Sequence, residues 1–141
     1  MSIAYTVCKA KIEDLKILDP IHAENMKGYV ERVYPWNDKL FRDCFAPEEY
    51  QIIAIEGKIV GFFKIVTSTT DIYLAEIQIL SQYQNSGIGT SLLQSIIDRA
   101  KANNLRLWLK VIKGNPAEQL YKRLGFTIFE ESLTHKKMQI I

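Results

Sequence analysis

Hydrophobic and polar residues alternate in several short runs of the chain, a pattern that predicts β-strands. A first strand is expected over residues 6–10. Two β-rich runs, residues 49–56 and 58–67, are joined at Glu56-Gly57, a spacing typical of an antiparallel hairpin. Further strands are predicted over residues 72–80, 105–112, 126–131 and 135–141.

Between the first strand and the hairpin, hydrophobic residues recur at helical spacing. A polar, helix-like stretch begins at Lys11, and we expect Pro20 to interrupt it. The residues after Pro20 that form one apolar stripe are His22, Met26, Tyr29, Val30 and Val33. Asn37 or Asp38 is expected to cap a short second helix that extends to about Phe45.

The strongest amphipathic pattern in the chain follows Gly87. Its apolar residues share one helical face and are Ile88, Leu92, Leu93, Ile96, Ile97 and Ala100. Asn103-Asn104 is expected to end this helix. A short last helix over residues 116–124 starts with proline and ends at Gly125. The order β, α, α, β, β, β, α, β, α, β, β predicts an α/β fold, a mixed sheet packed by helices.

Composition and charge narrow the class of protein. A chain of 141 residues can enclose its own hydrophobic core, and we expect a single domain over residues 1–141. No apolar run is long enough to cross a bilayer, and residues 1–10 do not resemble a secretory signal. We therefore expect a cytoplasmic protein that does not bind membranes. A net charge of +2, with acids among the bases, does not favour nucleic acid as a partner.

The two cysteines are expected to have a structural role and not a catalytic or metal-binding one. Cys8 and Cys44 have no CxxC spacing and no histidine partner nearby in the sequence. We therefore expect buried, reduced thiols in preference to a disulfide, a metal site or a nucleophile. The sequence predicts no metal site.

A glycine-rich turn at residues 84–90 joins a predicted strand directly to the amphipathic helix. Gly87 and Gly89 would let phosphate oxygens approach the main chain, and the amides and dipole of a first helical turn favour an anion. A tightly packed turn without a ligand is the alternative. The sequence lacks GxxxxGK[ST] and the third glycine of a dinucleotide fingerprint. A Rossmann unit would also use its first strand-to-helix turn.

Two motifs follow one another along the second half of the chain. The first is Gln84-x-x-Gly87-x-Gly89, with Tyr83 before it and Leu92-Leu93 after it, and the second comprises Asn115-Pro116-Ala117, Leu120-Tyr121 and Leu124-Gly125-Phe126. They resemble the acetyl-CoA motif Q/R-x-x-G-x-G/A and the N-x-A and LYxxxGF blocks of the GCN5-related N-acetyltransferase (GNAT) family. Their order and elements match, so the resemblance extends over nearly the whole chain and is weakest at residues 12–46.

The resemblance implies an acyl-CoA N-acyltransferase fold, in which about four helices flank a mostly antiparallel sheet of about seven strands. It implies an enzyme that moves the acetyl group of acetyl-CoA to a primary amine by direct attack in a ternary complex. The acceptor would be a small-molecule amine or a protein amino group, and a homodimer is compatible with the family. The alternative is an acyl-CoA-binding sensor, which would keep the glycine turn but lose the acceptor chemistry.

The resemblance also assigns the binding of acetyl-CoA to three segments. The pantetheine arm would bond to the backbone of Ile77, Gln78 and Ile79, which are also ordinary core-strand residues. Pyrophosphate would meet the main-chain amides of Gln84, Asn85, Ser86, Gly87, Ile88, Gly89 and Thr90. Asn115 would contact the cofactor or position the acceptor, although a helix cap explains this residue equally well.

Acetylation of an amine requires two proton movements. An amine with a pKa near ~10 must lose a proton before it attacks, and a hydrogen-bond donor stabilises the departing thiolate. The resemblance implies that Tyr121 is the general acid, with core packing as its alternative. Glu76, near the start of the cofactor strand, is the leading candidate for the base, with a solvated strand residue as the alternative.

Other residues are weaker candidates for the base. Some family members place a glutamate in the L-x-V segment of the next strand, where this chain has Lys110. Glu24, Glu118 and His22 remain, although a histidine on an apolar stripe is more often a core residue. The aromatic residues Tyr34, Trp36 and Phe41 either line an acceptor pocket or anchor the helices, and we favour anchoring.

Overall fold

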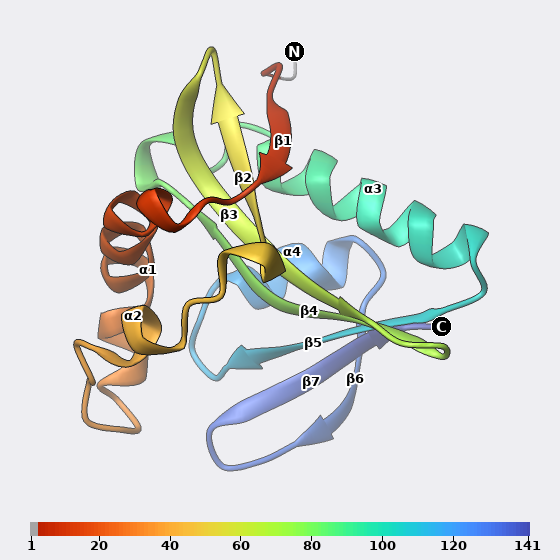
Figure 1. Cartoon of the computed structure of the whole chain (residues 1–141). Helices are drawn as coiled ribbons and strands as arrows, with labels where there is room; N and C mark the ends of the chain where they lie inside the picture. The colour runs from red at the N-terminus through yellow and green to blue at the C-terminus, as the bar shows by residue number, and fades with distance from the viewer. Residues whose placement is uncertain (1–2) are drawn as a thin grey trace. The chain divides into compact units, whose positions relative to one another are not determined.

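The computed structural model describes residues 3–141 (Figure 1). The chain divides into two compact units. Unit 1 comprises residues 3–64 and 76–88, and unit 2 comprises residues 65–75 and 89–141. Within residues 3–141, seven strands form one mixed sheet in the order β1-β2-β3-β4-β5-β7-β6, accompanied by four α-helices. The predicted fold class is therefore confirmed, and the single domain stays a prediction.

The strands of unit 1 are antiparallel, as the sequence pattern predicts. Strand β1 (Thr6–Lys9) pairs with β2 (Tyr50–Ile55), which pairs with β3 (Lys58–Thr67). Glu56 and Gly57 both have positive φ, 48° and 80°. Two successive left-handed residues give the turn that matches the twist of a hairpin, so the predicted hairpin is confirmed.

The first helix differs from the expectation at Pro20. After a short 3-10 turn (Ile12–Asp14), α1 (Leu15–Val30) continues through Pro20 without interruption. Proline removes one donor and leaves the carbonyl four residues earlier without its partner. Lys16 and Pro20 are both exposed, so water can solvate that carbonyl. The buried side chains of Leu18 and Ile21 hold the helix against the sheet on the other side.

The buried face of α1 is also not the predicted stripe. His22, Met26, Tyr29 and Val30 are half-buried, and Val33 lies exposed beyond the helix. The core cluster of unit 1 consists of Ala10, Leu18, Ile21, Tyr50, Ile52, Ala54 and Phe62. Its β2 members are alternate residues, because successive side chains of a strand point to opposite faces. Full burial of a side chain such as Phe62 contributes roughly 1.5–3 kcal/mol.

Both cysteines contradict the expectation of buried thiols. Cys8 and Cys44 are free and exposed. Cys8 lies on β1, whose four residues are all exposed. Cys44 is the last residue of the short helix α2 (Leu40–Cys44), none of whose residues is buried. Before α2, the Asn37 side chain accepts a hydrogen bond from the Lys39 amide, so it caps a turn rather than the helix itself.

Unit 2 contains the second amphipathic helix and the C-terminal strands. All six apolar residues predicted for one face of α3 (Ile88–Ala102) are buried. The strands are β5 (Arg106–Ile112), β6 (Thr127–Glu131) and β7 (His135–Ile140), with the short helix α4 (Ala117–Arg123) after β5. Strand β5 is antiparallel to β7 and parallel to β4 (Asp71–Ile79). The β4–β5 ladder covers Asp71–Leu74, only the first half of β4.

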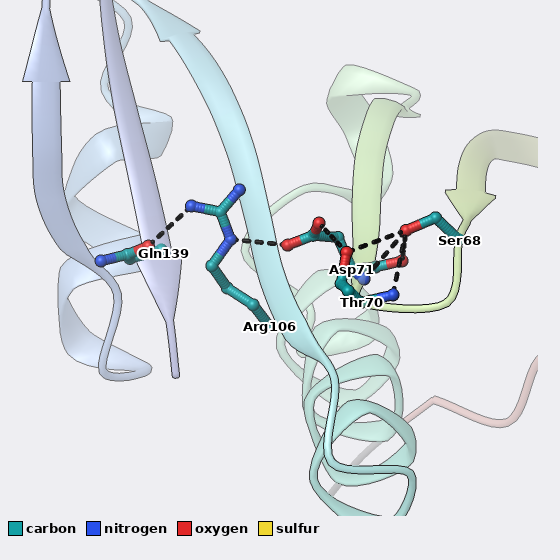
Figure 2. A network of polar contacts seen from close by, with 5 residues as sticks. All are labelled: Ser68, Thr70, Asp71, Arg106 and Gln139. Atoms are coloured by element: carbon teal, nitrogen blue, oxygen red, sulfur yellow. Dashed lines mark hydrogen bonds and ion pairs between the residues drawn. The ribbon is translucent and has the colours of Figure 1, made fainter.

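A polar network fastens the beginning of β4 to its neighbours (Figure 2). Arg106 Nε donates to Asp71 Oδ1 at 2.7 Å, and Arg106 Nη1 donates to Gln139 Oε1 at 3.1 Å. Thr70 Oγ1 donates to Asp71 Oδ2 at 2.7 Å. The hydrogen bonds from Thr70 and then Arg106 hold the pKa of Asp71 below its ordinary value. No helix within residues 3–141 is long and apolar enough to cross a membrane.

Candidate active site

In unit 1 a chain of side-chain amides connects α1 to the second half of β4. Asn25 Nδ2 donates to Gln78 Oε1 at 3.0 Å and to the Ile79 carbonyl at 2.9 Å. Because Oε1 of Gln78 faces Asn25, its Nε2 faces the other way and donates to Glu76 Oε1 at 2.6 Å. Gln78 is buried, so this arrangement fixes the Glu76 carboxylate from within the protein.

Glu76 lies in the second half of β4, not near its start as the sequence analysis placed it. His22 of α1 approaches it, with Nε2 3.8 Å from Glu76 Oε1. The side chains are 17% and 21% exposed, so the carboxylate is sheltered but accessible. Within residues 3–141, both polar contacts of Glu76 are made through Oε1, which leaves Oε2 for a ligand.

Aromatic rings surround His22. Its imidazole stacks on Phe41 at 4.5 Å and on Trp36 at 5.8 Å between ring centroids. Phe41 also packs against Tyr50 and Phe62 of the core, so it anchors α2 on the sheet as expected. Tyr34 is 51% exposed, and the expectation that it anchors the helices in preference to lining an acceptor pocket stays a prediction.

Tyr50 is a residue of this site that the sequence analysis missed. Burial, followed by the charges of Glu76 and Glu49 and by Cys44, raises its pKa to about 12. The phenol therefore keeps its proton and can only act as a neutral hydrogen-bonding group. Alternation along β2 places Tyr50 on the same face as Ile52, but the sequence does not reveal that Glu76 lies nearby.

The Tyr50 pKa predicts a loss of stability in alkali. In the unfolded chain the phenol ionises near its ordinary value of 10.0, and in the native state near about 12. The unfolded state therefore releases its proton first, so Tyr50 contributes stability that is present below pH 10 and lost as the pH rises toward 12. Relative to Tyr50→Phe, the free energy of unfolding should fall by about 1.4 kcal/mol between pH 9 and 11. Denaturant titrations of both proteins measure this difference, and parallel pH dependences would contradict it.

The glycine turn begins after a 3-10 turn at Ser81–Tyr83. Gly87 has φ of 91°, which favours glycine, and a Cβ placed there would meet no atom within 4 Å. The Ser86 hydroxyl donates to the Tyr83 carbonyl, and Asn85 is also left-handed with φ of 59°. The backbone at Gly87 is thus open on the side where a side chain would stand. This opening fits the close approach of phosphate oxygens.

The first turn of α3 supplies the remaining predicted phosphate contacts. Ile88 is buried and anchors the start of the helix, whereas Gly89 is half-buried and Thr90 is exposed. The Gln84 side chain points back along the chain and donates to the Ile79 carbonyl at 2.9 Å. That carbonyl accepts from Asn25 as well, so both of its lone pairs are engaged within the protein.

Unit 2 carries the other predicted site residues. Asn115 Oδ1 accepts a hydrogen bond from the Ala117 amide at 2.9 Å, so it satisfies the first amide of α4, whose N-cap position is Pro116. Tyr121 is buried, and its ring lies 5.8 Å from that of Phe126. Gly125 has φ of 105°, as the end of α4 requires. Asn115 and Tyr121 thus have structural contacts, and their proposed roles stay predictions.

Of the weaker carboxylate candidates for the base, Glu118 is held in ion pairs and Glu24 is exposed to solvent. Glu118 bonds to Lys122 at 2.9 Å and to Lys136 at 3.0 Å, and these hydrogen bonds, Lys122 first, lower its pKa. Glu24 is exposed and accepts from Ser81. Lys110 is exposed on β5. Within residues 3–141, no group of three or more His, Cys, Asp and Glu residues could hold a metal ion.

Comparison with known proteins gives the family. The profile of the Acetyltransferase (GNAT) family matches residues 13–126, and the chain belongs to this family. It is 32% identical over 94 residues to ribosomal protein bS18-alanine N-acetyltransferase of Haemophilus influenzae, covering 65% of this chain and 64% of that protein. It is 30% identical over 90 residues to an N-alpha-acetyltransferase of Sulfurisphaera tokodaii, covering 53% of this chain and 54% of that protein.

Solved structures show the same fold. The PaiA N-acetyltransferase of Thermoplasma acidophilum, solved in complex with coenzyme A, superposes with a TM-score of 0.77. The two sequences are 17% identical, and the match covers 97% of this chain and 98% of that one. The match therefore confirms the predicted acyltransferase fold, while the sequence matches span between about half and two thirds of the length of the curated relatives.

Proposed function

We propose that this protein is an N-acetyltransferase that moves the acetyl group of acetyl-CoA to a primary amine, and that the amine is the α-amino group of a protein N-terminus. The observation that carries the proposal is the sheltered Glu76 carboxylate, which is fixed through Oε1 and open at Oε2. Family membership supports the reaction class. The names of the two curated relatives support a protein α-amine as acceptor.

The residues at the glycine turn fit the donor. Pyrophosphate is proposed to bind the main-chain amides of residues 84–90, where the backbone at Gly87 is open and α3 begins. The pantetheine arm is proposed to bond to the backbone of residues 77–79. Because the Ile79 carbonyl is already saturated by Asn25 and Gln84, the contribution of Ile79 would be limited to its amide.

The proposed chemistry takes place in one ternary complex. Acetyl-CoA supplies the thioester carbonyl that the amine attacks. Glu76 accepts a proton from the acceptor ammonium, directly or through water, which frees the nitrogen lone pair for attack. Tyr121 donates its hydroxyl proton to the sulfur as the carbon–sulfur bond breaks. The second nitrogen proton of the tetrahedral intermediate passes through solvent to restore the Tyr121 hydroxyl, and Glu76 returns its proton to water. The products are the acetylated amine, free CoA and one proton, with no net oxidation or reduction.

An acceptor screen distinguishes this enzyme from an acyl-CoA-binding sensor. The release of CoA thiol is followed with acetyl-CoA and a panel of N-terminal peptides and small amines. The proposal predicts acceptor-dependent thiol release, with peptides preferred. Tight acetyl-CoA binding without thiol release for any acceptor would support the sensor.

Donor binding is expected to depend on Gly89. Acetyl-CoA at about 100 times its Kd should add roughly 2.7 kcal/mol to the native state. Gly89→Val should remove most of the resulting rise in Tm, because the branched side chain stands on the proposed path of the phosphates. Gly89 is inside α3 and has no positive φ, so this substitution avoids the strain expected at Gly87.

Thermal shift measurements with and without acetyl-CoA test this prediction. Gly28→Ala is the control, because Gly28 is exposed on α1 and a Cβ there meets nothing within 4 Å. The control should keep the full ligand-induced shift. A folded Gly89→Val protein with an undiminished shift would show that the pyrophosphate is not bound at this turn.

A further inference from the structure

His22 has a buried nitrogen without a hydrogen-bond partner. Among the side chains of residues 3–141, His22 Nδ1 is the buried nitrogen or oxygen atom that has no hydrogen-bond partner in the structure. The ring stacks on Phe41 and Trp36, so carbon surfaces cover its faces. Its other nitrogen, Nε2, is directed at the Glu76 carboxylate.

The unpaired nitrogen identifies the tautomer. A buried N–H without an acceptor is rarer in proteins than an acceptor whose lone pair is unused. Of the two neutral tautomers, the one with hydrogen on Nε2 leaves only an unused lone pair at Nδ1. It also places its N–H on the nitrogen that lies 3.8 Å from Glu76 Oε1.

We propose that His22 is a positioning residue for Glu76: its Nε2–H and the Gln78 amide together hold Glu76 Oε1, so that Oε2 faces the acceptor ammonium. This inference rests on the proposed function, because it assigns His22 a task in amine deprotonation. His22 itself does not take the proton from the substrate. The ammonium N–H bond breaks, and the proton bonds to Oε2 of Glu76.

Two donor groups from different elements lie nearest the same oxygen, Glu76 Oε1, at different distances. Gln78 Nε2 comes from β4 itself and lies 2.6 Å from Oε1, whereas His22 Nε2 comes from α1 and lies 3.8 Å from the same atom. The longer separation exceeds a hydrogen bond, and catalytic contacts of this kind often tighten only when substrate binds. The proposal therefore predicts that His22 matters during turnover more than it matters for folding.

The spacing of His22 and Asn25 along α1 supports a specific role for this helix face in holding the polar residues of β4. His22 and Asn25 are three residues apart, so they share a face of the helix, and each reaches one of two alternate residues of β4, Glu76 and Gln78. Leu18 and Ile21 bury the neighbouring part of α1 completely or nearly so, at 0% and 3% exposure. His22, whose side chain is 17% exposed, lies outside that fully buried part of the helix.

The test is a double-mutant cycle with Glu76→Gln. His22→Phe keeps a ring against Phe41 but removes the donor, and it should lower kcat by about 10-fold to 10²-fold with little change in acetyl-CoA affinity. In the Glu76→Gln background the same substitution should change kcat by less than about 2-fold, because the carboxylate that His22 positions is gone. Met26→Leu, a half-buried substitution on the same helix, is the control and should keep the wild-type kcat.

A second pair keeps the test informative if His22→Phe does not fold. His22→Gln retains a side-chain N–H donor, whereas His22→Met has similar length and no donor. Gln should restore most of the rate that Met loses. Equal rates for Gln and Met, or equal losses of kcat in both Glu76 backgrounds, overturn the inference while leaving the proposed function intact. A wild-type protein that acetylates no amine overturns both.

Discussion

Tyr121→Phe is expected to lower turnover by on the order of 10² to 10⁴ while acetyl-CoA still binds. The phenol hydroxyl is proposed to protonate the leaving sulfur, so its removal affects the transition state more than the bound ground state. The ring remains buried against Phe126, which should limit the change in the free energy of unfolding to less than about 1.5 kcal/mol.

Turnover, acetyl-CoA affinity and thermal stability are measured on one preparation of this variant. Phe126→Leu is a matched control, because it disturbs the same packing without touching a hydroxyl group. The control should lower the Tm and leave kcat near the wild-type value. If Tyr121→Phe turns over like wild type where the chemical step limits the rate, Tyr121 is a packing residue and solvent protonates the thiolate.

Glu76→Gln should show the second large effect, a loss of rate that depends on pH. An α-amine has a pKa of about 7.7–8.0, so most of it is protonated below pH 7. Without the proposed base, the variant can acetylate only the fraction of amine that is already deprotonated. We expect a loss of about 10²-fold at pH 6.5 that shrinks as the pH rises past 8, with unchanged acetyl-CoA affinity. The amide keeps the size of the carboxylate and can still accept from Gln78.

The pH–rate profile under saturating acetyl-CoA measures this effect. Glu31→Gln, which changes an exposed glutamate just after α1, serves as the control for the loss of one negative charge and should follow wild type. A Glu76→Gln profile that is parallel to wild type at every pH would remove Glu76 from the mechanism.

The sequence predicted those elements whose determinants are local. The apolar residues of α3 repeat at helical spacing over four turns, and all six are buried. The hairpin at Glu56-Gly57 and the end of α4 at Gly125 depend on residues that tolerate positive φ. In each case the information lies within one continuous segment of the chain. Tertiary packing did not override it.

Pro20 and the cysteines show where local reasoning fails. Pro20 is compatible with a continuous helix because it lies on the exposed side of α1, where water can solvate the carbonyl that loses its hydrogen bond. No local sequence pattern shows which side of the helix faces solvent. The expectation for Cys8 and Cys44 came from the general tendency of cysteine to be buried. Cys8, however, lies at the edge of the sheet, where β1 has a neighbour on one side only.

One part of the candidate site depends on a continuous segment, and the other depends on contacts between segments that are distant in the sequence. The glycine turn lies in one continuous segment, so its motif could indicate residues 84–90 from the sequence alone, and their binding of acetyl-CoA stays a prediction. The environment of Glu76 is made by contacts across more than fifty positions, such as the hydrogen bond from Asn25 to Gln78. Sequence spacing could not reveal that His22, Tyr50 and Gln78 surround one carboxylate, although it did include Glu76 and His22 among the candidates.

The most direct test of the central claim, acetyl transfer to a protein α-amine, is mass spectrometry of a peptide incubated with the protein and acetyl-CoA. The peptide has a free N-terminus and one internal lysine, and the control is the same peptide with its N-terminus blocked. We predict the gain of one acetyl group at the N-terminus, matched by an equal amount of released CoA, and no reaction of the blocked peptide. Acetyl-CoA binding with no acetylated product, or equal acetylation of both peptides at lysine, would contradict the account.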